Sequence, residues 1–180
     1  MGAMSHLKIG DEAVSFKLPG VDGKEHSLDE YKDKNAVVVI FSCNHCPYVR
    51  AWEDRMVQIQ ADYASKSVQL IAINANDASK YPDDSFPNMK ERASVKKFNF
   101  PYLRDETQSV ARAYGAQRTP EVFLFNKNSI LRYHGTIDDN CDDPKAVKEH
   151  FLRAALDAVL AGNSISTAET QPVGCSIKWK

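Results

Sequence analysis

Two cysteines separated by two residues are the side chains in this sequence whose type and spacing could do chemistry. Cys43 and Cys46 enclose Asn44 and His45, and they follow the run AVVVIF at Ala36–Phe41. A continuous, β-branched apolar run of this kind is typical of a strand buried on both faces of a parallel sheet. Apolar side chains then recur at spacings of four, four and three across residues 45–65, which predicts a helix. The pair is therefore expected at a strand-to-helix turn.

A thiol at the beginning of a helix is a good nucleophile. Unpaired N–H groups and a partial positive charge at the helix N-terminus stabilise a thiolate. We therefore predict thiol–disulfide chemistry, in which Cys43, placed just before the helix, is the exposed nucleophile. Cys46, one turn inside the helix, would be shielded and would resolve the mixed disulfide.

Two other interpretations of the pair remain open. A CxxC motif is also half of a zinc site, but a structural zinc needs four ligands, and no second pair with ligand spacing follows in the sequence. The sequence therefore indicates no metal, and it indicates no other cofactor. Alternatively, the two cysteines could be inert core residues, although such residues would not need to lie at a strand-to-helix turn.

The other predicted elements must hold this turn in place. The strands expected are residues 15–18 and 25–28, which would pair as a hairpin, then Ala36–Phe41, Val68–Asn74, 121–125 and 130–134. The helices expected are residues 45–65, 88–98, 106–114 and 143–162, the last with Asp143 as its cap, Pro144 in its first position and Gly162 at its end. This order predicts one α/β domain with parallel central strands and an antiparallel pair at one side.

Composition excludes several classes of function. The 180 residues carry a formal net charge of -1, which gives no electrostatic basis for binding nucleic acid. The longest apolar run, Ala36–Phe41, is far too short to cross a bilayer, so no membrane association is expected. Four cysteines are too few for a disulfide scaffold. Residues 1–6 contain no secretory signal, which favours a cytoplasmic protein, although an exported location stays open. The oligomeric state cannot be predicted.

Several motifs together resemble the thioredoxin superfamily, and within it the redoxin proteins related to alkyl hydroperoxide reductase. The matching segments are FSCNHCPYV, AINANDASKYPDDS, FPYLRDETQSVARAYGAQRTPEVFLF, GTIDDN and GCSIKWK. The resemblance covers residues 15–180. It implies a thioredoxin-like fold, with a central mixed β-sheet flanked by helices, an N-terminal β-hairpin and an inserted helix at residues 88–98. The whole chain, 1–180, would be one such domain, with its core at about 15–162 and a tail at 163–180.

The resemblance also implies a substrate-binding edge. It places Thr119 and a cis Pro120 across from Cys43, where backbone groups of Thr119 would dock an extended substrate. An X–Pro bond is the only kind that is cheap to hold in cis, and an exposed backbone edge can pair with a peptide. An ordinary trans proline at the start of a strand is the alternative.

This sequence departs from thioredoxin around the cysteines. Ser42 replaces the usual Trp, Asn44-His45 replaces Gly-Pro, and Ala36–Phe41 contains no acidic residue, so a buried carboxylate beneath the disulfide is not expected. We interpret Asn44 and His45 as modulating residues. An imidazole near the Cys43 sulfur would favour the thiolate and make the disulfide more oxidising. An exposed His45 with little effect is the alternative.

For the other two cysteines and for a group of aspartates, the sequence predicts a minor chemical role or none. Cys175 lies in the GCS motif that the resembled proteins share, which makes it a possible third thiol, with an ordinary tail cysteine as the alternative; Cys141 is expected to be incidental. A group of aspartates lacks the spacing of a calcium loop and is expected to be solvated or to cap helices. These are Asp77, Asp83, Asp84, Asp138 and Asp139.

These observations predict a thiol–disulfide oxidoreductase that acts on protein or small-molecule disulfides with a thiol reductant and has an antioxidant role. A peroxiredoxin-like peroxidase is one alternative, but its Pro-x-x-x-Thr/Ser-x-x-Cys motif fits neither Cys43 nor Cys46. A non-catalytic thioredoxin-fold binding module is the other alternative, and it would not need two intact cysteines.

Overall fold

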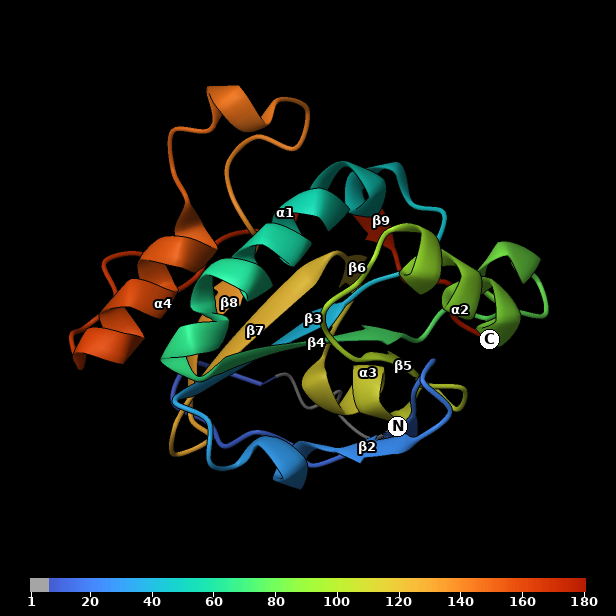
Figure 1. Cartoon of the computed structure of the whole chain (residues 1–180), viewed down its shortest axis with the longest axis horizontal. Helices are drawn as coiled ribbons and strands as arrows, with labels where there is room; N and C mark the ends of the chain where they lie inside the picture. The colour runs from blue at the N-terminus through green and yellow to red at the C-terminus, as the bar shows by residue number, and fades with distance from the viewer. Residues whose placement is uncertain (1–6) are drawn as a thin grey trace.

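A five-stranded mixed sheet forms the centre of the computed structural model (Figure 1). Its order is β5 (Tyr102–Arg104), β4 (Val68–Asn74), β3 (Ala36–Phe41), β7 (Glu121–Asn126) and β8 (Leu131–Gly135). Strand β3 pairs parallel with β4 and antiparallel with β7; β4 pairs parallel with β5, and β7 antiparallel with β8. This arrangement confirms the predicted mixed α/β fold class.

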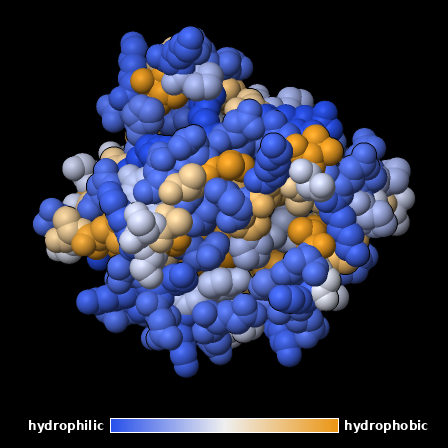
Figure 2. Space-filling view, in the orientation of Figure 1, coloured by the Kyte–Doolittle hydropathy of each residue, from blue (hydrophilic) through white to orange (hydrophobic). Residues whose placement is uncertain are grey.

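The structure describes residues 7–180. Residues 1–6, in which no secretory signal was found, lie outside the described part of the chain. Among residues 7–180, no helix combines the length and the apolar character that a membrane crossing requires. The face shown in Figure 2 is mostly hydrophilic, with small and scattered apolar patches.

Helices cover both faces of the sheet, which explains why β3 is apolar at every position. Ala36, Val38 and Ile40 face a core shared with α1 (Pro47–Tyr63) and α4 (Phe151–Ala161). The intervening side chains of β3 face a second core shared with α3 (Ser109–Tyr114) and the N-terminal segment. Figure 1 shows α1 and α4 over one face and α3 over the other. Because both faces are covered, each of the six residues of β3 is buried.

Two predicted accessory elements are present. Strands β1 (Lys17–Pro19) and β2 (Glu25–Ser27) pair antiparallel as the N-terminal hairpin. The inserted helix is α2 (Phe86–Val95), which begins two residues before the predicted start because Ser85 caps it and accepts a hydrogen bond from the Asn88 N–H. Within residues 7–180, four 3-10 turns complete the connections: η1 (Leu28–Tyr31), η2 (Ala64–Lys66), η3 (Pro82–Asp84) and η4 (Pro144–Ala146).

The predicted boundary of the last helix is wrong. Asp143 caps only the short turn η4, and α4 begins at Phe151, so the residues between them form a loop that projects from the body (Figure 1). The Asp139 carboxylate accepts the N–H of Lys148 at 3.0 Å, and the Asp143 carboxylate accepts that of Lys145. The bond to Asp143 is a normal N-cap bond, but the bond to Asp139 takes a backbone N–H that a continuing helix would use, which keeps this segment from continuing as a helix.

The tail contains a strand that the sequence pattern does not reveal. Strand β9 (Cys175–Ser176) pairs antiparallel with β6 (Arg118–Thr119), so residue 175 lies opposite residue 119. A second tail segment lies beside β8, where the His134 N–H donates to the carbonyl oxygen of Ala168 at 3.0 Å. The last residues of the chain therefore pack onto the same end of the sheet as the cysteine pair.

Candidate active site

The cysteine pair lies where β3 gives way to α1, as predicted. Strand β3 ends at Phe41, and Cys46 is the N-cap residue of α1, which has Pro47 in its first turn. The expected exposure of Cys43 is wrong, because this residue is only 3% exposed and Cys46 is fully buried. The two thiols form a small buried cluster with Val49, and Cys175 of the tail packs against it.

Thr119 meets both sulfurs. Its Oγ1 lies 3.6 Å from Cys43 Sγ, and its carbonyl oxygen lies 3.4 Å from Cys46 Sγ, which donates to it when the thiol carries its proton. The Thr119–Pro120 peptide bond is cis, which confirms the bond geometry expected from the family resemblance. The structure thus brings Cys43, Cys46 and Thr119 together. The edge of Thr119 is already paired with β9, so an extended substrate would have to displace the tail to dock there.

Surrounding groups favour negative charge on Cys46 rather than on Cys43. A hydrogen bond from the Cys43 thiol is the largest cause that lowers the pKa of Cys46; burial opposes it, and the thiol of Cys175 and the N–H groups of Val49 and Cys175 reinforce it. The same bond raises the pKa of Cys43, and burial and the charge of Asp84 raise it further. This differs from the prediction, because the α1 N–H that reaches a sulfur, that of Val49, bonds to the N-cap residue Cys46 and not to Cys43.

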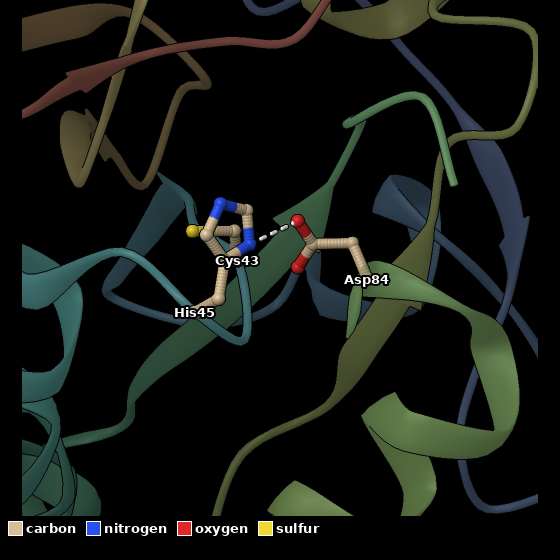
Figure 3. A group of neighbouring side chains, drawn as sticks. All are labelled: Cys43, His45 and Asp84. Atoms are coloured by element: carbon tan, nitrogen blue, oxygen red, sulfur yellow. Dashed lines mark ion pairs between the residues drawn. The ribbon is translucent and has the colours of Figure 1, made fainter. Parts of the chain in front are cut away.

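A buried carboxylate lies beside Cys43, contrary to expectation. Asp84 was expected to be solvated but is fully buried at the end of η3. Its Oδ2 lies 2.6 Å from Nδ1 of His45, and ligand atoms of Cys43, His45 and Asp84 lie within 4.8 Å of one another (Figure 3). His45 is thus near the Cys43 sulfur, as the modulating role requires, and it also faces a fixed negative charge.

Asn44 fixes the loop between the two cysteines. Its N–H donates to Asp84 Oδ1 at 2.7 Å, and its side-chain amide donates to the carbonyl oxygen of Asp83 at 2.9 Å. Its side-chain oxygen accepts the Tyr102 hydroxyl at 2.7 Å. Both halves of the Asn44-His45 dipeptide therefore hold the segment that carries Asp84, which gives a structural reason for residues other than Gly-Pro here.

Two further asparagines complete a polar network that the sequence analysis missed. Asn74 donates to Asp84 Oδ1 at 3.1 Å, and Asn76 donates to Asp84 Oδ2 at 2.9 Å. Both are buried at the carboxyl end of β4. The signal that could have identified them is the polar run Asn74-Ala75-Asn76-Asp77 directly after a buried strand, since ligands of α/β sheets gather at the carboxyl ends of strands.

A metal ion does not fit this cluster. Cys43, His45 and Asp84 have suitable donor types, but each Asp84 oxygen already has two partners: Asn44 and Asn74 at one, Asn76 and His45 at the other. A metal bound to Asp84 would leave buried amide donors without an acceptor, which is costly. The donor set therefore fits a buried negative charge held in place beside a thiol.

The remaining predicted residues lie apart from this centre or at its edge. Cys141 is partly exposed, and its thiol donates to the carboxylate of Asp142 at 3.5 Å. Asp138 was expected to be solvated but is buried, where it accepts the Trp52 indole N–H at 3.0 Å and pairs with Arg55. This ion pair ties the end of β8 to α1 and has no contact with the thiols.

Comparison with known proteins identifies a family and a relative whose name states its activity. A profile of the AhpC/TSA family matches residues 9–134. The chain is 28% identical over 131 residues to the thiol-disulfide oxidoreductase ResA of Halalkalibacterium halodurans, which covers 72% of this chain and 70% of that protein.

Two solved structures match nearly the whole chain. An uncharacterized conserved protein from Geobacillus kaustophilus is 41% identical, with a TM-score of 0.92 and coverage of 97% of this chain and 93% of that one. A hypothetical protein from Sinorhizobium meliloti is 38% identical, with a TM-score of 0.92 and coverage of 98% and 97%. The family profile ends before the tail, whereas these two structures include it.

Proposed function

The chain belongs to the AhpC/TSA family, and from this premise we propose that it is a thiol–disulfide oxidoreductase whose redox pair is Cys43 and Cys46. The observation that carries the proposal is that the two sulfurs, at the beginning of α1, both lie within hydrogen-bonding distance of Thr119. Two thiols that share a hydrogen bond can close a disulfide with little backbone movement. The name of the ResA relative supports the same reaction class.

The proposed reaction uses both thiols in turn. Cys43 attacks one sulfur of an incoming disulfide while the Cys46 thiolate accepts the Cys43 proton, and the leaving sulfur departs as a thiolate. The departing thiolate takes this proton from Cys46, and the Cys46 thiolate then attacks Cys43 in the mixed disulfide, which releases the second substrate thiolate and forms the Cys43–Cys46 disulfide. The substrate is reduced by two electrons, and the pair is oxidised by the same two.

Protein or small-molecule disulfides are the proposed substrates, and a thiol reductant would return the pair to its dithiol form. Once β9 has been displaced from this edge, Thr119 and Pro120 would lie along the substrate, and His45 and Asn44 would tune the pair through Asp84. Direct reduction of a hydroperoxide is not proposed, because neither cysteine has the peroxidatic motif.

A trapping experiment tests this proposal. After incubation with oxidised glutathione, Cys46→Ser should retain one glutathione at Cys43 as a stable mixed disulfide, because the resolving thiol is missing. The matched control is Cys141→Ser, which removes a thiol outside the site and should behave like the unmodified chain. Peptide mass spectrometry locates the adduct. Consumption of hydrogen peroxide at the same rate as exchange, or an adduct spread equally over Cys141 and Cys43, would refute the proposal.

A further inference from the structure

The tail is fixed onto the edge beside the cysteine pair by close backbone packing. A Cβ atom on Gly174 would lie 2.1 Å from the carbonyl oxygen of Thr119, so only glycine allows this approach. The Ile177 N–H then donates to the carbonyl oxygen of Gln117 at 2.9 Å, and its side chain is 3% exposed in the core. Backbone groups of Lys178 bond to Asn76 and Asp77. The tail segment is therefore part of the folded domain.

This placement brings a third thiol to the redox pair. Residue 175 is directly opposite Thr119 in the β6–β9 pairing, and Cys175 packs against the cluster of Cys43, Cys46 and Val49. Both its thiol and its N–H interact with the Cys46 sulfur. Cys175 is also partly exposed, whereas Cys43 and Cys46 are 3% and 0% exposed. It is therefore the thiol of the cluster that solvent reaches most readily.

Resting on the proposed function, we propose that Cys175 is an internal exchange partner that forms a Cys46–Cys175 disulfide and so connects the buried pair to external thiols. In this step the Cys175 thiolate attacks the Cys46 sulfur of the Cys43–Cys46 disulfide. The Cys46–Cys175 bond forms, the Cys43–Cys46 bond breaks, and Cys43 leaves as a thiolate that then takes up a proton. One disulfide and one thiolate are present before and after, so no further oxidant or reductant is needed.

The charges around Cys175 agree with this order of events. In the dithiol form, burial is the largest cause that raises the pKa of Cys175, and the neighbouring Cys46 raises it further, while Lys178 and Arg118 lower it. Oxidation of the pair removes the negative charge of Cys46. The pKa of Cys175 then falls, which increases its thiolate fraction when there is a disulfide for it to attack. In the β6–β9 pairing, its N–H and thiol already face the sulfur to be attacked.

The experiment compares Cys175→Ser with the unmodified chain. Cys141→Ser is the matched control, and Cys175→Ala is a second variant. Each protein is first oxidised with diamide, and the rate at which reduced glutathione restores its thiols is followed by acid quenching and alkylation. Because an adjacent thiol acts at a high effective concentration, we expect both Cys175 variants to be reduced at least about tenfold more slowly, and Cys141→Ser to be unchanged. In addition, Cys43→Ser treated with diamide should yield a peptide pair joined through Cys46 and Cys175.

The possible outcomes separate the two proposals. If Cys175→Ser forms the Cys43–Cys46 disulfide and is reduced as fast as the full chain, the role of Cys175 is wrong and the proposed function stands. If neither the full chain nor Cys175→Ser forms the Cys43–Cys46 disulfide, the proposed function is wrong. Absence of the Cys46–Cys175 peptide pair in oxidised Cys43→Ser also overturns the inference.

Discussion

Asp84 connects the polar network to the chemistry, and its replacement by asparagine should change both stability and redox potential. The carboxylate is fully buried and has four partners, two at each oxygen. An amide keeps the size of the group, removes its charge and turns one acceptor into a donor. The new NH2 group then faces two groups that donated hydrogen bonds to the carboxylate oxygen it replaces. Buried amides such as that of Asn76 would therefore lose their acceptor.

The stability change follows from these lost contacts. Hydrogen bonds to charged groups contribute about 1.5–3 kcal/mol each, so we expect Asp84→Asn to lower the free energy of unfolding by about 3–5 kcal/mol. For a domain of this size that corresponds to a decrease of about 10 °C in Tm. Asp83→Asn is the matched control, because Asp83 is exposed and interacts with Asn44 only through its backbone oxygen. Its free energy of unfolding should change by less than about 0.5 kcal/mol.

The same substitution should also raise the reduction potential of the Cys43–Cys46 disulfide, because it removes a negative charge that disfavours the reduced, thiolate-containing form. After the bond to Cys46 and burial, the charge of Asp84 is the next cause that raises the pKa of Cys43. At the 4.8 Å limit of the cluster and an effective dielectric constant of about 20, two unit charges interact by about 3.5 kcal/mol. The polar partners of Asp84 screen part of this interaction; half of it, about 1.7 kcal/mol, corresponds to slightly more than one pKa unit and to about 37 mV.

Glutathione redox titration of Asp84→Asn, followed by thiol alkylation and mass spectrometry, measures this potential. Asp84→Asn should be more oxidising than the unmodified chain by up to about 37 mV, because the two hydrogen-bonded sulfurs share one negative charge, and removal of the Asp84 charge stabilises it. This is an upper bound, since most of the shared charge lies on Cys46 and not on Cys43. A potential within a few millivolts of the unmodified chain, in a variant whose Tm has fallen, would show that Asp84 is structural only. A more reducing variant would contradict the electrostatic argument itself.

Three further predictions concern the loop, the tail and pH. His45→Gln removes an imidazole that contacts Asp84 beside Cys43 and that can carry positive charge, so it should make the disulfide more reducing, opposite in sign to Asp84→Asn; a shift in the same direction in the redox titration would contradict this. Gly174→Ala places a Cβ against the carbonyl oxygen of Thr119 and must displace β9, so iodoacetamide should label the redox pair faster, and an unchanged labelling rate would show that the tail does not shield it. Burial lowers the pKa of His134, but Glu121 and then Glu169 raise it above its ordinary value. The stability that these two ion pairs contribute is therefore fully present below about pH 6.5, and it is lost as the pH rises through the pKa of His134 in the folded state. Urea unfolding of His134→Gln across this range should show the loss of that pH dependence.

The sequence pattern located the centre of the site because its signal is local. A six-residue apolar run followed by CxxC and a helical period specifies strand, turn and helix within a single stretch of chain. Thr119 and Pro120 were associated with it only through the family resemblance, since no pattern in the sequence measures distance across 76 residues. Their position beside both sulfurs follows from the pairing of β7 with β3.

The parts that could not be predicted depend on contacts distant in sequence. Asp84 looks like any aspartate of a polar loop, and its burial follows from Asn44 on one side and from Asn74 and Asn76 on the other. Strand β9 has only two residues and no period, and it exists because β6 offers it a free edge. Helix α4 begins late because the Asp139 carboxylate takes the Lys148 N–H, a backbone donor that a helix starting at Asp143 would use.

The central claim is that Cys43 and Cys46 form one redox pair, and counting thiols at defined glutathione ratios tests it most directly. The sequence contains four cysteines, so the fully reduced chain has four thiols. As the ratio of oxidised to reduced glutathione rises, we expect the Cys43 and Cys46 thiols to be lost together in one two-electron transition, with a peptide pair joined between them. In Cys43→Ser that Cys43–Cys46 pair cannot form, and its transition should be absent. Independent loss of the two thiols, or both remaining free while Cys141 reacts, would show that Cys43 and Cys46 are not one redox pair.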